Sequence, residues 1–99
     1  MIARHWTGLA KAERASDYLT HLRSETFPAL RALRGFAGVT VLRRDVARGV
    51  EFLVITKWES LNDIRAFSGD DVERAVVPAA AQDMMIDYDR VARHYDVVE

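Results

Sequence analysis

The segment 51–67, EFLVITKWESLNDIRAF, constrains the fold most strongly, because its hydrophobic period changes midway. Residues 52–58 carry apolar side chains at both odd and even positions, which is typical of a strand buried on both faces. Residues 60–67 then have the apolar spacing of a helix. A chain of 99 residues has limited material to cover both faces of such a strand. The segment therefore predicts a sheet that buries its second face against a partner.

Alternating and helical spacings along the rest of the chain predict a further helix and three further strands. We expect strands over residues 2–9, 36–44, 50–58 and 87–98, a helix over 11–33, and a broken helical region over 61–86. The pieces of that broken region are expected over 61–67, 72–77 and 79–86. Pro28 has no amide hydrogen for a helix ladder, so it is expected to kink or restart the first helix.

The resulting order β-α-β-β-α-β is the split βαβ or ferredoxin-like arrangement. We expect a four-stranded antiparallel sheet in which the first and last strands are neighbours and the very apolar third strand is central. The predicted class is α+β, with one domain over residues 1–99.

Composition excludes several classes of protein. The net charge of -1 argues against a nucleic-acid partner, which normally requires a basic face. The chain has no cysteine, so disulfides, zinc–thiolate sites and thiol nucleophiles are excluded. Neither a signal peptide nor an apolar run of ~20 residues is expected, so we predict no membrane partner and a cytoplasmic location.

Short segments spread over the whole chain match one known family. They are 2–6 (IARHW), 35–38 (GFAG), 42–45 (LRRD), 58–60 (WES), 64–69 (IRAFSG), 75–78 (AVVP) and 94–97 (HYDV). Together they resemble the antibiotic biosynthesis monooxygenase superfamily of dimeric α+β barrels. The resemblance implies a homodimer in which two sheets meet face to face, and a pocket in each subunit between sheet and helices. Its characterised members include cofactor-independent oxygenases, haem-degrading enzymes and isomerases, and fold alone does not choose among these activities.

Trp58 matches the tryptophan that lies near the pocket in this family. Tryptophan can stack on an aromatic substrate and donate its indole N–H, which makes Trp58 a candidate substrate-binding residue. The alternative is that Trp58 only fills the core at the end of its strand.

His5 and His94 fall on strands that are expected to be neighbours, and histidine is suited to proton transfer near neutral pH. We treat both as candidate catalytic residues, with structural strand histidines as the alternative. The histidines, including His21, lack the short spacing of a metal-binding motif, so no metal site is predicted.

Arg65 and Arg74 lie in the second helical region, and Arg74 is the candidate for holding an anionic or enolate substrate oxygen. The alternative is ion pairing with nearby surface acids. Tyr18, Tyr88 and Tyr95 are further phenolic donors, although half-buried tyrosines are commonplace.

No cofactor is predicted. The haem-degrading branch of the family uses a first-strand asparagine and a helix histidine, but residues 2–9 contain no asparagine and residues 61–86 contain no histidine. The chain also lacks a glycine-rich phosphate loop and a flavin or nicotinamide fingerprint.

Two functions follow from these observations. The first, implied by the resemblance, is a cofactor-independent monooxygenase-like protein acting on an aromatic or quinone-like small molecule. His5 or His94 would take a proton, and the substrate anion would react with oxygen or rearrange. The alternative is a non-catalytic dimer that binds a small ligand or is associated with stress. The absence of an assembled polar motif favours this alternative, whereas aromatics and histidines around one cavity would favour the enzyme.

Overall fold

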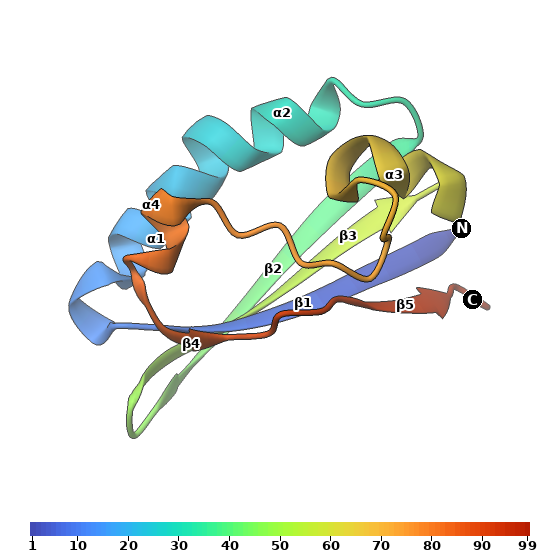
Figure 1. Cartoon of the computed structure of the whole chain (residues 1–99). Coiled ribbons are helices and arrows are strands. Elements are labelled where there is room, and N and C mark those ends of the chain that lie inside the picture. The colour runs from blue at the N-terminus through green and yellow to red at the C-terminus, as the bar shows by residue number, and fades with distance from the viewer.

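The computed structural model describes residues 1–99 as one antiparallel sheet with all its helices on the same face (Figure 1). The strands are β1 (Ile2–Ala10), β2 (Phe36–Val46), β3 (Gly49–Trp58), β4 (Met85–Tyr88) and β5 (Arg93–Asp96). The α-helices are α1 (Ala15–His21), α2 (Phe27–Arg31), α3 (Leu61–Ser68) and α4 (Ala79–Gln82). The strand order is β2-β3-β1-β4, and β5 also pairs with β1. This order confirms the predicted ferredoxin-like arrangement.

The pairing of β1 with β3 decides which residues face the helices. The register runs from Ile2 opposite Trp58 to Ala10 opposite Val50, so the even-numbered residues of both strands share the helix-covered face. Phe52 and Trp58 on that face are fully buried. Odd-numbered β3 residues lie on the outer face, which no helix of the chain covers (Figure 1). The predicted apolar character of β3 on both faces is therefore confirmed.

The first helical region is continuous in space but irregular in hydrogen bonding. A 3-10 turn (Ala12–Arg14) leads into α1, and a π-helical turn (Leu22–Thr26) joins α1 to α2. Pro28 occupies the second position of α2, where a missing amide hydrogen is tolerated. The helix was expected to kink or restart near Pro28. Instead it continues, and the irregularity is the wider π-helical turn that precedes α2. None of the helices has the length and apolar content that a membrane crossing requires.

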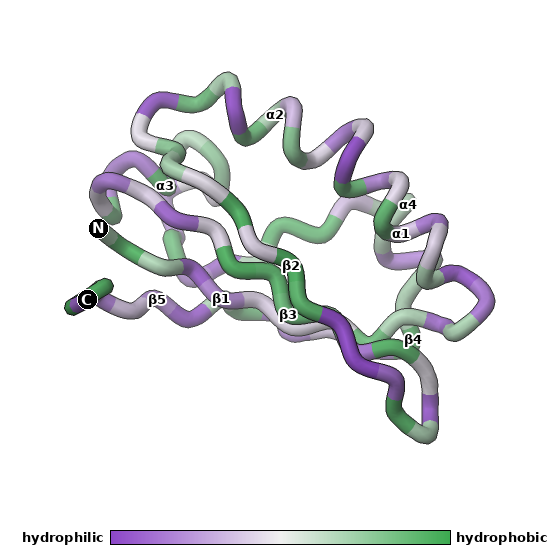
Figure 2. The backbone as a smooth tube through the Cα atoms, turned by 180° about the vertical axis from the view of Figure 1, so that it is seen from behind, coloured by the Kyte–Doolittle hydropathy of each residue, from purple (hydrophilic) through white to green (hydrophobic).

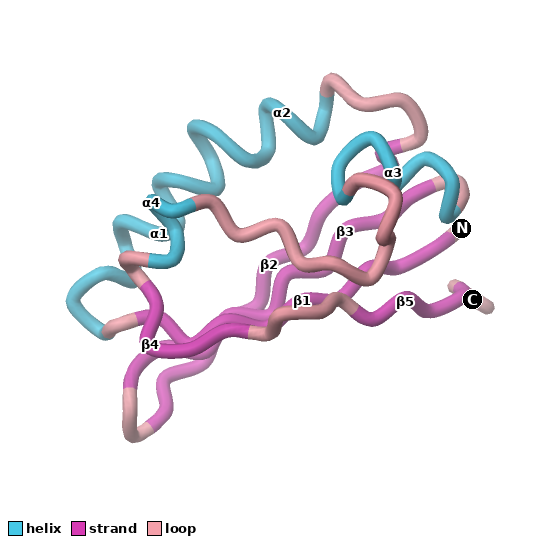
Figure 3. Tube along the Cα trace, in the orientation of Figure 1, coloured by secondary structure: helices cyan, strands magenta, loops and turns pink.

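One predicted helical piece is wrong. Residues 72–77 form no helix, and the segment between α3 and α4 runs as a loop (Figure 3). The reason is that this segment hydrogen-bonds to the last part of the chain: the Ala75 amide donates to the Arg90 carbonyl, and the Ala92 amide donates to the Glu73 carbonyl. Because residues 90 and 92 bond to this loop, their part of the chain does not pair with β1. The single strand expected over 87–98 is therefore interrupted and appears as two short strands, β4 and β5.

The piece expected as helix over 79–86 is only partly correct. α4 ends at Gln82, and Met85 begins β4 by pairing with Ala10 of β1. Met85 is buried in the larger core cluster, which packs the sheet against α1 and α4. Burial at this sheet edge outweighs the helical spacing of the sequence.

Gly35 and Gly69 provide a matched test of packing around α3. Both have a φ of 83°, and at Gly69 this combines with a ψ of -169°, a backbone conformation that costs other residues about 1–3 kcal/mol. A Cβ on Gly35 would lie 2.2 Å from Oδ2 of Asp63, whereas a Cβ on Gly69 would meet nothing within 4 Å. We expect Gly69→Ala to lower the free energy of unfolding in urea by about 1–3 kcal/mol through backbone strain alone, and Gly35→Ala to lower it by more. Equal losses for the two variants would contradict the contact with Asp63.

Candidate functional site

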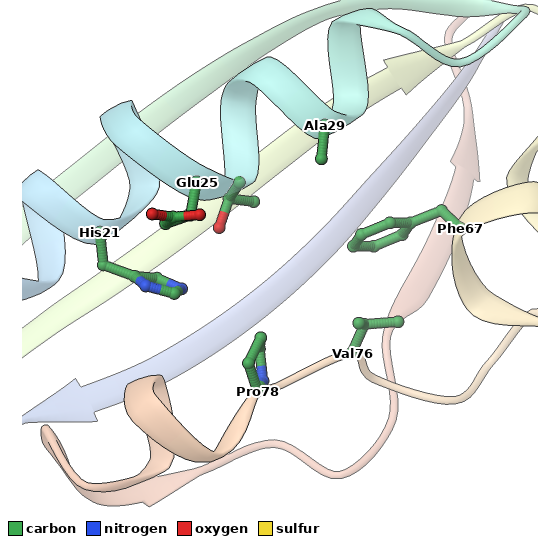
Figure 4. Close-up of a pocket in the computed structure, with 7 residues that line it drawn as sticks. His21, Glu25, Ala29, Phe67, Val76 and Pro78 are labelled. Atoms are coloured by element: carbon green, nitrogen blue, oxygen red, sulfur yellow. The ribbon is translucent and has the colours of Figure 1, made fainter.

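A cleft of about 160 Å³ opens on the helix side of the sheet, between the first helical region and the chain that precedes α4 (Figure 4). Its lining residues are His21, Glu25, Thr26, Ala29, Phe67, Val76 and Pro78. Figure 4 shows His21 and Glu25 on one wall, with Phe67, Val76 and Pro78 facing them. The π-helical turn (Leu22–Thr26) supplies part of this wall, and π-turns recur at functional sites. We call this space the helix-side cleft.

A smaller cavity of about 50 Å³ continues the cleft towards the sheet. The two spaces share His21, Thr26, Val76 and Pro78, and the inner one adds Trp6, Tyr18, Leu22, Val77 and Ala81. Gly8 makes room for the Trp6 ring, because a Cβ on Gly8 would lie 2.5 Å from that ring. The Trp6 indole N–H donates to the Asp89 carbonyl at 2.9 Å, which holds the ring in place.

Aromatic rings surround the inner end of the cleft. The Tyr18 ring lies edge-on to Phe52 with centroids 5.0 Å apart, and it lies 6.3 Å from the Trp6 ring. His21 stacks beside Tyr18, with centroids 6.4 Å apart and planes 20° apart. Such walls suit a flat, apolar ligand, because aromatic faces and edges pack well against another ring.

Trp58 lies behind the cleft and does not line it. Its side chain is 0% exposed and packs between Phe36 and Phe67, with ring centroids at 5.4 and 6.2 Å. Its indole N–H already donates to Oγ1 of Thr56 at 2.9 Å. Trp58 therefore supports Phe67, which does line the cleft. Its predicted contact with substrate stays a prediction.

His5 and His94 lie on paired strands, as expected, but their side chains are on opposite faces of the sheet. In the register of β1 and β5, His94 is opposite Arg4, and His5 is opposite Arg93. His5 lies on the outer face, with its ring 4.9 Å from that of Tyr95. One subunit thus does not bring the two histidines together, and the catalytic role of each stays a prediction.

His94 is the partner of a buried arginine. Nη1 of Arg4 lies 2.9 Å from Nε2 of His94, and because a guanidinium only donates, this nitrogen accepts. The neutral ring then carries its hydrogen on Nδ1, so while this bond holds neither ring nitrogen is free to take a substrate proton. Burial and, to a smaller extent, the Arg4 charge lower the pKa of His94, while Glu73 acts in the opposite direction.

Arg74 also lies away from the cleft. Its guanidinium donates to the Ser68 carbonyl at 3.3 Å, and its side chain borders a separate pocket of about 260 Å³ beside Tyr88 and Arg90. Neither Arg74 nor Arg65 forms an ion pair with an acid; Arg65 donates to the Asp70 carbonyl at 3.1 Å. The role of Arg74 in holding a substrate oxygen stays a prediction.

Sequence reasoning missed the residues that line the cleft most closely. His21 entered only as a metal-ligand candidate, and Tyr18 only as one of three phenols. The spacing of Ala15, Tyr18 and Leu22, which are all buried, was a usable signal for the inward face of α1. His21 follows Tyr18 by three residues and therefore lies beside it on the helix.

A second groove, of about 500 Å³, is larger but more open to solvent. It contains His94, Glu73 and the exposed side chains of Val91 and Tyr95. Its histidine already bonds Arg4 and is therefore committed to holding the fold. The helix-side cleft is the better candidate, because it combines enclosure, aromatic walls and an imidazole.

Comparison with known proteins supports the fold. No family model and no curated protein matches the chain. A crystal structure of a candidate antibiotic biosynthesis monooxygenase from Bacillus cereus superposes with a TM-score of 0.68 at 22% identity, covering 100% of this chain and 93% of that one. A MhuD mutant with two manganese protoporphyrin IX molecules per active site gives 0.68 at 18% identity, covering 100% and 96%. The chain therefore has the α+β fold of the antibiotic biosynthesis monooxygenase superfamily, as the sequence predicted.

A porphyrin does not fit the cleft of this chain. A cavity of about 150 Å³ is known to hold one benzene ring, so about 160 Å³ is space for a single ring and not for a macrocycle of four pyrroles. His21 offers an imidazole in the cleft, and one imidazole is enough to ligate a haem iron, so it is the volume of the cleft that argues against a porphyrin. No step of the proposed chemistry is therefore assigned to haem.

The Arg4–His94 bond predicts a pH dependence of stability. Because the folded pKa of His94 is lowered, the unfolded chain takes up a proton below about pH 6.5 that the folded chain resists. The stabilisation is therefore complete above the ordinary pKa and is lost as the pH falls. His94→Gln keeps an acceptor for Arg4 without titrating. Between about pH 8 and pH 5, we expect the wild type to lose more unfolding free energy in urea than His94→Gln. Parallel losses would contradict this role for His94.

Proposed function

We propose that the protein is a homodimeric, cofactor-independent monooxygenase-like protein that takes an aromatic or quinone-like small molecule into the helix-side cleft. The observation that carries the proposal is the cleft itself, which places His21 beside apolar and aromatic walls between helices and sheet. The solved structures with the same fold support it, since one is a candidate monooxygenase.

The residues of the cleft suggest how such a reaction would proceed. His21 is the histidine that lines the cleft, so we assign it the proton from a substrate hydroxyl. A hydroquinone supplies all the electrons itself. One atom of dioxygen becomes the new ring oxygen of a hydroxyquinone, and the other leaves as water with two substrate hydrogens. No external reductant is needed.

Binding without turnover is the second candidate. It is favoured by the groups that are already occupied: Trp58 donates to Thr56, and Nε2 of His94 accepts from Arg4. His21 is then the one imidazole that lines the cleft, and the carboxylate of Glu25 is the one other basic group in the lining. A protein of this kind would bind the same ligands and consume no oxygen.

The proposal is tested with purified protein and a panel of single-ring hydroquinones and quinones. We expect saturable quenching of tryptophan fluorescence that persists in Trp58→Phe and is lost in Trp6→Phe, because Trp6 borders the inner cavity and Trp58 does not. For the enzyme, oxygen uptake should exceed that of buffer and fall at least ~10-fold in His21→Gln.

The variants His5→Gln, His94→Gln and Arg74→Gln test the sequence-based roles in the same assays. Loss of uptake in one of them, with His21→Gln fully active, would overturn the assignment to His21. Quenching without oxygen uptake would favour the non-catalytic binder. Absence of both would reject the helix-side cleft as the site.

We also propose that two copies associate through their outer sheet faces. Apolar side chains of this face include Leu9, Leu42, Leu53, Ile55 and Tyr95. Leu42 and Tyr95 are each 49% exposed. No helix of the chain lies over this face of the sheet (Figure 1). Figure 2 shows the green apolar stretches of β2 and β3 side by side, with purple polar residues towards the hairpin end. A second copy would bury this patch, which is the cover that the two-faced β3 lacks.

Leucines of similar exposure allow a matched test of this interface. Leu42 on the outer face is 49% exposed, and Leu61 at the start of α3 is 43% exposed. We expect sedimentation equilibrium at tens of micromolar to give twice the 11.2 kDa chain mass for the wild type and Leu61→Asp. Leu42→Asp should shift the mass towards one chain, because it would bury a carboxylate in the interface. A wild type that sediments as a monomer would contradict the proposed dimer.

A further inference from the structure

We infer that the Tyr18 hydroxyl is the hydrogen-bond donor that anchors a neutral, single-ring ligand by a carbonyl oxygen at the inner end of the helix-side cleft. This inference rests on the proposed function, because it concerns the same cleft. It goes further by naming the group that orients the ligand and the kind of ligand that fits.

Tyr18 is placed deep in the site by α1. Its side chain is 3% exposed, belongs to the larger core cluster and lines the inner cavity. The inner cavity is continuous with the larger cleft through His21, Thr26 and Pro78, which border both. A ligand that enters the cleft between His21 and Phe67 therefore advances towards Tyr18.

The Tyr18 hydroxyl is unpartnered within the chain. The other deep aromatic donors are used, since Trp6 bonds the Asp89 carbonyl and Trp58 bonds Thr56. No hydrogen bond of the structure involves the Tyr18 hydroxyl, yet no sealed side-chain polar atom lacks a partner. The hydroxyl is therefore open to the cavity. A nearly buried phenol without a hydrogen bond lowers the stability of the fold. A ligand oxygen that accepts a hydrogen bond from it would remove that cost.

The protonation state of Tyr18 makes it a donor. Burial raises its pKa well above the ordinary value of 10.0, so the group stays a neutral phenol at physiological pH. A phenol O–H donates a hydrogen bond, and the carbonyl oxygen of a ketone or quinone is a suitable acceptor. The His21 ring lies nearly parallel to the Tyr18 ring, with the two centroids 6.4 Å apart.

The size and charge of the cleft narrow the ligand further. A volume of about 160 Å³ matches one six-membered ring. Phe67, Val76 and Pro78 form an apolar wall for that ring. The carboxylate of Glu25 borders the same cleft and disfavours an anion such as an aryl carboxylate. The favoured class is therefore a neutral single-ring ketone or quinone.

The test compares two ligands of equal shape. Acetophenone carries a carbonyl on one ring, and α-methylstyrene replaces that carbonyl by C=CH2. In titration calorimetry, we expect Tyr18→Phe to weaken acetophenone about 3- to 10-fold and to change α-methylstyrene by less than about 2-fold. Benzoate should bind more weakly than acetophenone to the wild type. Equal losses for both ligands, or tighter binding of benzoate, would overturn the inference.

A control variant and a second measurement separate the hydroxyl from other causes. His21→Leu should keep most of the preference for acetophenone, and a preference that disappears in this variant but survives in Tyr18→Phe would overturn the inference. Independently of any variant, the carbonyl ¹³C resonance of bound acetophenone should move downfield from its position in an apolar solvent. An unshifted resonance would also overturn it. Failure of the wild type to bind either neutral ligand would reject the proposed function as well, whereas binding without dependence on Tyr18 would reject only the anchor.

Discussion

The arrangement of the C-terminal half depends on the hydrogen bonds made by the buried guanidinium of Arg4. Arg4 is 4% exposed and forms no ion pair; it donates to the carbonyls of Val72 and Arg74 and to His94. Desolvation lowers its pKa to about 10, and the charge of Asp71 offsets part of that shift. One side chain on β1 thereby holds both the loop after α3 and the last strand.

This arginine also shapes the helix-side cleft, although it does not border it. Val76 and Pro78 form one wall of the cleft, and they continue directly from the carbonyls that Arg4 binds. The ring of Phe67 lies 5.8 Å from the Arg4 guanidinium and faces the cleft on its other side. The buried charge thus positions the loop wall and the aromatic wall together. Its cost in desolvation is offset by hydrogen bonds that no neutral residue of similar size would make.

Much of the fold could be predicted from the sequence, because alternation and helical spacing are local signals. The strand that contains Phe52 and Trp58, and the order of strands in the sheet, were both accessible in this way. Residues 72–77 were not, because their backbone bonds go to residues 90 and 92, which are distant in sequence. No local pattern reveals that Arg4, an apparently ordinary strand arginine, would be buried there.

The candidate site was harder to predict than the fold, since it depends on register. In a strand, moving by one residue changes the face, and the alignment of Arg4 with His94 puts His5 on the opposite side of the sheet. Trp58 was correctly placed where sheet meets helix, but its depth behind Phe67 depends on packing that one sequence does not specify. Tyr18 and His21 could be recognised in the sequence as possible functional residues. That they lie together with Trp6 around one cavity depends on the tertiary structure.

The π-helical turn (Leu22–Thr26) has a geometric consequence for both faces of the first helical region. Each residue of a regular helix advances by about 100°, so an unbroken helix that buries Leu22 would direct position 29 inwards again. The extra residue of the wider turn delays that phase by one position. Leu30 is the buried residue instead, and Ala29 is turned to the cleft with Glu25. One added residue thus rotates the rest of the helical region relative to its first half. The apolar side chains of both halves can then face the sheet, while Glu25 and Ala29 line the helix-side cleft.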